Sequence, residues 1–116
     1  MLLVFLLLGQ LSSYLLMIMT YLLFFFASIL GTNGIPHFVK GLAGEKHMTP
    51  FNKPSGAATN VIWGAFNIFL SVLIFHWAIT YSYNFYIASF VVLAAATFGG
   101  ALQGNYWQND AKARGR

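Results

Sequence analysis

Two long stretches of this chain carry no charged side chain, and they constrain its fold more than any other feature. No Asp, Glu, Lys or Arg occurs between Met1 and Val39 or between Pro54 and Asn109. Only 7% of the residues are charged, against roughly 25% in a typical soluble domain. Because so few residues can face water, a conventional soluble core cannot form. The sequence therefore predicts an all-α integral membrane protein.

The apolar runs are long enough for three membrane-crossing helices, since one crossing needs about 20 apolar residues. We expect one transmembrane domain over residues 1–116, with a long loop at 31–55 and a tail at 107–116. Splitting the first run would leave neither half long enough to cross. The predicted fold is a three-helix bundle whose helices cover about residues 3–30, 56–80 and 85–106.

The first helix is expected to end at Gly31–Gly34, because Gly and Asn tolerate the backbone that terminates helices and Pro36 opposes continuation. A 30-residue helix is about 45 Å long, so it is tilted or its first turns protrude from the bilayer. Three- and four-residue spacing predicts one face toward the other helices, made of Ser13, Met17, Thr20, Phe24, Ala27 and Gly31.

Every Lys and Arg lies in the central loop or in the C-terminal tail. With three helices these segments share one side of the membrane, which the positive-inside rule makes cytoplasmic. The expected location is therefore a cell membrane, with the N-terminus outside and the C-terminus in the cytoplasm.

Small and amide side chains recur on one face of the second and of the third predicted helix. These residues either pack helices together, with amides hydrogen-bonding across the interface, or line a solute path. No acidic residue lies in any predicted helix, so a proton relay built on Asp or Glu is excluded. The residues are Asn60, Gly64, Asn67, Ser71, Ala96, Gly100, Gln103 and Gly104.

The loop holds the residues that a ligand or partner outside the bilayer would meet: Asn33, Pro36, His37, Lys40, Glu45, Lys46 and His47. His37, Glu45 and His47 form a weak zinc-like set, because their spacing matches no strong motif and a fourth ligand is missing. Ordinary interfacial loop residues are the alternative, and we predict no metal. Haem ligation by His76 with a loop histidine is disfavoured, because His76 is predicted near the opposite membrane surface.

The basic residues predict membrane contacts rather than nucleic-acid binding. Lys40, Lys46 and Lys53 either bind anionic lipid head groups or only set the orientation of the chain. No cofactor is predicted, and the absence of cysteine excludes thiolate and disulfide chemistry.

Four strings resemble a group of small, uncharacterised bacterial multi-span membrane proteins, over about half of the chain. They are NGIPHFVKG at Asn33–Gly41, GEKHMTPF at Gly44–Phe51, KPS at Lys53–Ser55 and NVIWG at Asn60–Gly64. A weaker similarity is to DoxX-like small membrane proteins, which have four spans. Neither resemblance implies a catalytic residue.

Two functions remain open from the sequence. The first is a non-catalytic membrane protein that acts as a subunit of a larger complex or as a self-associating scaffold. The second is a minimal transporter or channel that forms a path only as an oligomer, lined by Asn60, Asn67 and Gln103. An embedded enzyme lacks any nucleophile–base or two-carboxylate arrangement.

Overall fold

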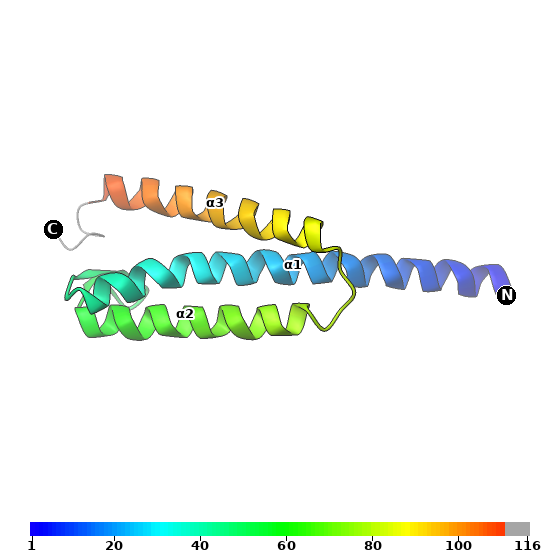
Figure 1. The fold of residues 1–116 in the computed structure, drawn as a ribbon, viewed down its shortest axis with the longest axis horizontal. Helices are drawn as coiled ribbons and strands as arrows, with labels where there is room; N and C mark the ends of the chain where they lie inside the picture. The colour runs from blue at the N-terminus through cyan, green and yellow to red at the C-terminus, as the bar shows by residue number, and fades with distance from the viewer. Residues whose placement is uncertain (111–116) are drawn as a thin grey trace.

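The computed structural model describes residues 1–110, so the part of the predicted tail at 111–116 lies outside the described residues. All three of the helices in the described part are long and apolar enough to cross a membrane. This confirms the all-α class and the number of helices. In Figure 1 the longest helix, α1, lies between α2 and α3. The elements are α1 (Leu2–Leu42), β1 (His47–Thr49), β2 (Asn52–Ser55), α2 (Ala57–Ala78) and α3 (Phe85–Asn109).

The predicted loop at 31–55 is wrong in its first half, because α1 continues through it to Leu42. Pro36 lies inside this helix. Gly31 and Gly34 do not end the helix, since Gly44 alone has a positive φ in the described chain. They face α2 at short range instead: a Cβ on Gly34 would lie 2.8 Å from the Gly64 carbonyl oxygen. These glycines serve a close helix contact rather than a turn.

The actual end of α1 is a Schellman motif centred on Gly44, whose φ is +76°. The amide of Glu45 donates to the Lys40 carbonyl at 2.9 Å, and the amide of Gly44 donates to the Gly41 carbonyl at 3.0 Å. Both bonds satisfy carbonyl groups that the last turn of a helix leaves without partners. A glycine does end α1, as the sequence predicted, but it is Gly44 rather than Gly31 or Gly34.

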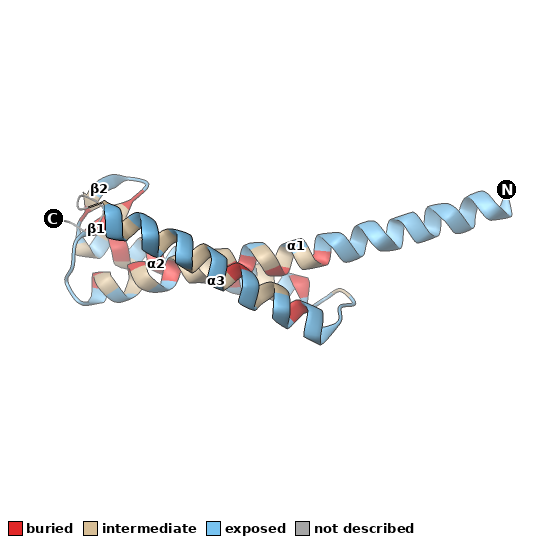
Figure 2. Ribbon diagram, turned by 90° about the horizontal axis from the view of Figure 1, so that it is seen from above, coloured by how far each residue is buried: buried red, intermediate tan, exposed pale blue. Residues whose placement is uncertain are grey.

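The two halves of α1 have different surroundings. From Thr20 onward one side of the helix is buried, whereas every residue from 1 to 19 is exposed. Figure 2 shows this N-terminal half extending alone beyond the ends of α2 and α3. Ser13 and Met17, which were expected on the packing face, are therefore exposed. We call residues 2–19 the N-terminal extension.

The contact between α1 and α2 depends on glycine. A Cβ on Gly64 would lie 2.4 Å from the Phe38 amide nitrogen, and a Cβ on Gly41 would lie 2.6 Å from the Val61 amide nitrogen. No side chain fits at such distances, so the two backbones touch directly. Ser71 adds a bond across the same contact by donating to the Ala27 carbonyl at 2.6 Å.

Helix α3 packs against α1 rather than against α2. Its buried residues are Ala88 and Ala95, and Ser28 of α1 donates to the Val92 carbonyl at 2.8 Å. Asn84 caps the start of α3 by accepting from the Ile87 amide. The helix is thus held along one side, and most of its surface is left exposed.

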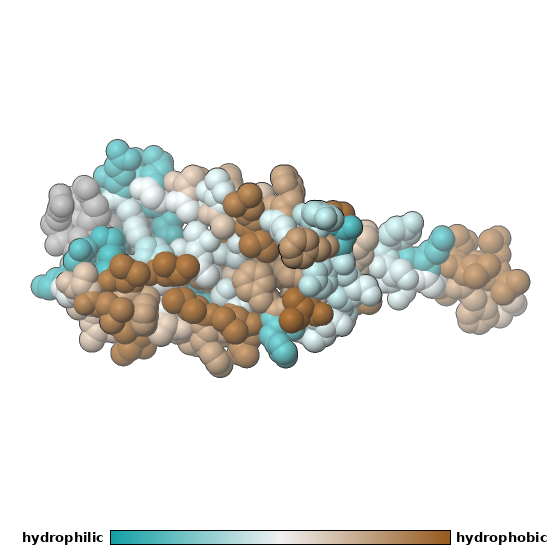
Figure 3. All heavy atoms as spheres, in the orientation of Figure 1, coloured by the Kyte–Doolittle hydropathy of each residue, from teal (hydrophilic) through white to brown (hydrophobic). Residues whose placement is uncertain are grey.

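The second half of the predicted loop is an antiparallel β-hairpin. The hydroxyl groups of Thr49 and Ser55 lie 2.6 Å apart across it, in a buried hydrogen bond. The hairpin joins α1 to α2 and lies near the C-terminal end of α3 (Figure 1). Figure 3 shows hydrophilic side chains gathered at this end of the molecule and an apolar surface at the opposite, N-terminal end.

Candidate functional site

Asn60, in the first turn of α2, organises the hairpin end of the molecule. Its side-chain nitrogen donates to the backbone carbonyls of His47, Ser55 and Gly56 at 3.0, 3.2 and 3.1 Å. Its side-chain oxygen lies 2.8 Å from Nδ1 of His37. Asn60 is fully buried, and these four bonds join α1, the hairpin and α2. Its role is to hold these elements together, so it does not line an open path in this structure.

His37, His47 and Trp107 form an aromatic cluster beside Asn60. The ring centroids of His47 and Trp107 are 4.0 Å apart, and His37 meets both rings edge-on at 5.6 and 5.2 Å. Residues from α1, the hairpin and α3 therefore meet at one point. His37 was expected on a loop, but the continuation of α1 places it on a helix at 4% exposure.

His47 is fully buried, and neither ring nitrogen has a hydrogen-bond partner among the described residues. The pKa of His47 is lowered to about 4, first by burial and then by electrostatic repulsion from the His37 and Lys40 side chains, against a weaker opposing effect of the Met48 backbone and Glu45. His47 is therefore neutral at neutral pH.

A cavity of about 280 Å³ lies next to this cluster, between α1, the hairpin, α2 and α3. At its edge the Gln103 side-chain amide donates to the Asn33 side-chain oxygen at 3.0 Å. The same two residues also line a second cavity of about 250 Å³, which Asn67 borders from α2. Two cavities thus meet at the Asn33–Gln103 pair. The first cavity is lined by Asn33, His37, Met48, Thr49, Pro50, Trp63, Gln103, Tyr106 and Trp107.

Two ion pairs flank this end of the molecule. Lys53 of β2 pairs with Asp110 after α3 and donates to the Tyr106 hydroxyl at 2.9 Å. These bonds raise the pKa of Lys53 and fasten the hairpin to α3. Lys40 pairs with Glu45 at 2.8 Å. Lys46 is exposed and has no ion pair within residues 1–110.

The loop residues named from the sequence are thus divided among several environments. Asn33, Pro36, His37 and Lys40 belong to α1. Glu45 and Lys46 are exposed next to the hairpin, whereas His47 is buried in it. Within residues 1–110 no group of three His, Cys, Asp or Glu is arranged to hold a metal ion.

The helix residues named from the sequence also separate by position. On α2 the expected face is the face toward α1, and its buried residues are Asn60, Gly64, Asn67, Ser71 and Ala78. On α3 the predicted packing face contains Gly100 and Gly104, but the face in closest contact with α1 contains Gly99. A Cβ on Gly104 would meet nothing within 4 Å, and a Cβ on Gly100 would meet only Thr32, at 3.4 Å. A Cβ on Gly99 would lie 2.7 Å from Ile29 instead.

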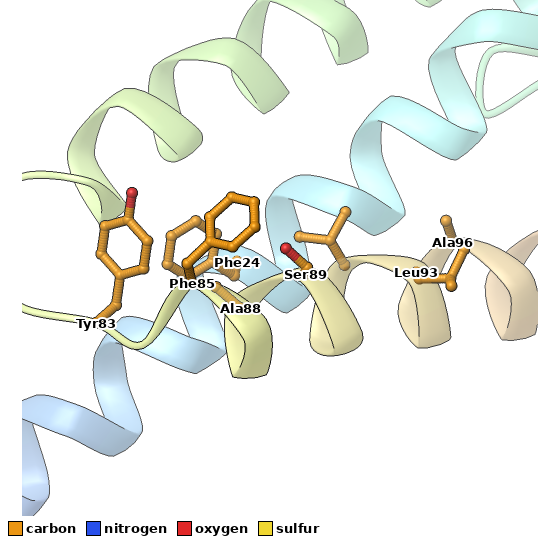
Figure 4. A pocket seen from close by; sticks show the side chains of 8 residues that line it. Phe24, Tyr83, Phe85, Ala88, Ser89, Leu93 and Ala96 are labelled. Atoms are coloured by element: carbon orange, nitrogen blue, oxygen red, sulfur yellow. The ribbon is translucent and has the colours of Figure 1, made fainter.

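Ala96 borders a third, mostly apolar cavity of about 370 Å³ at the other end of α3. In Figure 4, Phe24 of α1 lies among side chains from α3 and from the connection that precedes it. Ser89 supplies a hydroxyl to an otherwise largely hydrocarbon wall. This cavity offers packing space for apolar groups but no charged side chain for chemistry.

Sequence reasoning missed the role of Trp63, Trp107 and Tyr106. Tyr106 was predicted as the last residue of the third helix and Trp107 as the first residue of the tail, and neither was assigned a role in a site. Trp107 lies four residues after Gln103, which in turn lies four after Gly99, so helical spacing places all three on one face. That spacing could have predicted from the sequence that these three residues share one side of the third helix.

Comparison of the chain with family models, with curated proteins and with solved structures finds no match. The class therefore rests on the fold itself. Three helices in the described part are long and apolar enough to cross a membrane, and one end of this part carries a site lined by aromatic rings and amide groups.

Proposed function

We propose that this chain is a non-catalytic membrane protein that acts by self-association, as a scaffold or as a subunit of a larger complex. The observation that carries the proposal is the N-terminal extension. Every residue in it is exposed, and its side chains include Leu3, Phe5 and Leu7 at 57–69% exposure.

The length of α1 exceeds what one bilayer can cover. Its 41 residues make a helix of about 62 Å, while the hydrocarbon layer is roughly 30 Å thick. A tilt of 40°, the upper end of the usual range, still leaves about 47 Å along the membrane normal. The 22 residues of α2 give about 33 Å, which matches one crossing. Tilt alone therefore does not place all of α1 in lipid.

The N-terminal extension is an apolar segment about 27 Å long. Leaving it in water would be costly, because each buried aliphatic or aromatic side chain is worth about 1.5–3 kcal/mol relative to exposure. A helix that is apolar all round is typical of a protein core or of a membrane span. The N-terminal extension is accordingly proposed to lie against helices of a second copy, or of another subunit where one is present.

The proposed orientation places the N-terminus outside and both the hairpin and the C-terminus in the cytoplasm. Lys40, Lys46 and Lys53 then satisfy the positive-inside rule. Anionic lipid contact is proposed mainly for Lys46, since the other two lysines have carboxylate partners. A reporter fused after Arg116 tests the orientation: activity only outside the cell would contradict it.

Because the chain has no cysteine, a single introduced cysteine reports directly whether its position is accessible to a reagent in water. Leu7→Cys should resist a membrane-impermeant maleimide in intact membranes and react after denaturation. Lys46→Cys is the matched control, which should react whenever the cytoplasmic face is open. Fast labelling of Leu7→Cys in intact cells would mean that the extension stands in water without a partner.

The two cavities that share the Asn33–Gln103 amide pair favour a second candidate, an oligomeric transporter. Asn67 and Gln103 border the cavity of about 250 Å³, whereas Asn60 is committed to four hydrogen bonds. The path would therefore involve Asn67 and Gln103 without Asn60. If Asn67→Leu kept full assembly but abolished solute flux in liposomes, transport would replace the scaffold proposal.

A further inference from the structure

The hydrogen bonds of Asn60 determine which ring nitrogen of His37 is free to accept a hydrogen bond. The Asn60 side-chain nitrogen must face the three carbonyl oxygens to which it donates. Its oxygen therefore faces Nδ1 of His37. An amide oxygen only accepts, so Nδ1 carries the hydrogen and donates. In a neutral imidazole the other nitrogen, Nε2, is then an acceptor.

That acceptor is available at the cavity of about 280 Å³. His37 lines the cavity while being 4% exposed, and the structure gives Nε2 no hydrogen-bond partner within residues 1–110. The only buried polar side-chain atoms without a partner in residues 1–110 are the two ring nitrogens of His47, so Nε2 of His37 is open to the cavity. A ligand that donates a hydrogen bond at this position would use this acceptor.

The rest of the lining defines the ligand more closely. Trp63, Tyr106 and Trp107 contribute aromatic rings, which favour stacking or edge-on contact with another ring. Asn33 and Gln103 bond to each other through one donor and one acceptor. The side-chain nitrogen of Asn33 and the side-chain oxygen of Gln103 therefore remain available to a small ligand. Among the described lining residues none carries a formal charge at neutral pH, which disfavours an ion.

We propose that this cavity binds a small, uncharged aromatic compound with a hydroxyl group, which donates its hydrogen to Nε2 of His37. The volume is near the lower end of the range for ligand sites, which suits a single substituted ring. The site is formed by one copy of the chain, so this proposal does not depend on self-association.

The probes are 4-methylphenol and toluene, a pair that differs by one hydroxyl group. Protein labelled with ¹⁵N at histidine is titrated with each probe in nanodiscs, and the imidazole nitrogens are followed by NMR. We expect 4-methylphenol to shift the Nε2 resonance of His37 and to bind about fivefold more tightly than toluene, as one net hydrogen bond implies. His76, which lies at the opposite end of α2, is the internal control and should not shift.

Two variants separate binding from general partition into lipid. Met48→Trp adds bulk at the cavity wall without removing the His37–Asn60 bond, and it should abolish the shift. Met17→Trp makes the same change on the exposed N-terminal extension and should bind as the parent does. His37→Phe should bind both probes with equal affinity.

The proposal is overturned if 4-methylphenol leaves the His37 resonance unmoved up to its solubility limit. Equal affinity for the two probes in the parent protein would also overturn it, because the hydroxyl group would then have no partner. An unchanged shift in Met48→Trp would place the probe elsewhere.

Discussion

The two halves of α1 are both largely apolar but have opposite surroundings. Residues 20–42 touch α2 through backbone-level contacts at Gly34, Gly41 and Gly64, and they bury hydroxyl and imidazole groups with defined partners. The N-terminal extension has no partner within the described chain. The same apolar character therefore serves two purposes, since apolarity brings a helix into the membrane while small and polar residues select its neighbour.

Gly64→Leu should have the largest effect on the packed half. Its side chain would occupy space held by the Phe38 backbone, and backbone cannot move aside as a flexible side chain can. We expect a loss of about 3 kcal/mol or more, at or above the usual cost of overpacking, measured by denaturant titration in mixed micelles. Gly104→Leu is the matched control, because nothing lies near Gly104. Equal stability of the two variants would contradict the helix contact described above.

Asn60→Leu should come next, with a loss on the order of 2–3 kcal/mol, because it removes four bonds and leaves a buried donor of His37 without a partner. Asn67 donates only to the Trp63 carbonyl of its own helix. Asn67→Leu should therefore cost about 1 kcal/mol or less. Equal losses in melting experiments would show that Asn60 does not hold the hairpin.

The pH dependence of stability should involve His47. Its folded pKa of about 4 lies below the ordinary histidine value of 6.5, so the unfolded chain takes up the proton first. Stability is then complete above about pH 6.5 and falls as the pH is lowered toward 4, by an amount on the order of 1–3 kcal/mol. His47→Phe should flatten this part of the melting profile. A profile unchanged by the substitution would assign the dependence to other groups.

Gly100→Leu should have the smallest effect of the series, about 1 kcal/mol or less, because only the Thr32 methyl lies near its added Cβ. Gly99→Leu should cost more, since Ile29 would have to move. Thermal melting of the two variants side by side distinguishes the face that contacts α1 from the face next to it. If Gly100→Leu were the more destabilising of the two variants, the face predicted from sequence spacing would be the one that contacts α1.

Local patterns were sufficient to predict the helices and the buried face of α2. Asn60, Gly64, Asn67 and Ser71 follow helical spacing closely, so period alone identifies their common side. The end of α1 was not predictable in this way. Gly31–Gly34 and Gly44 are equally permissive in isolation, and only contact with Gly64 decides which glycines stay helical. The clustering of His37, His47 and Trp107 likewise depends on the packing of three separate elements.

The central claim is that the N-terminal extension lies against protein. The most direct measurement is the mass of the full chain extracted with its native lipid in polymer nanodiscs. The account predicts at least two copies of the chain, or a defined complex with another protein, and a lower mass for Leu7→Lys. A single copy of the unmodified chain, with no co-extracted partner, would contradict it.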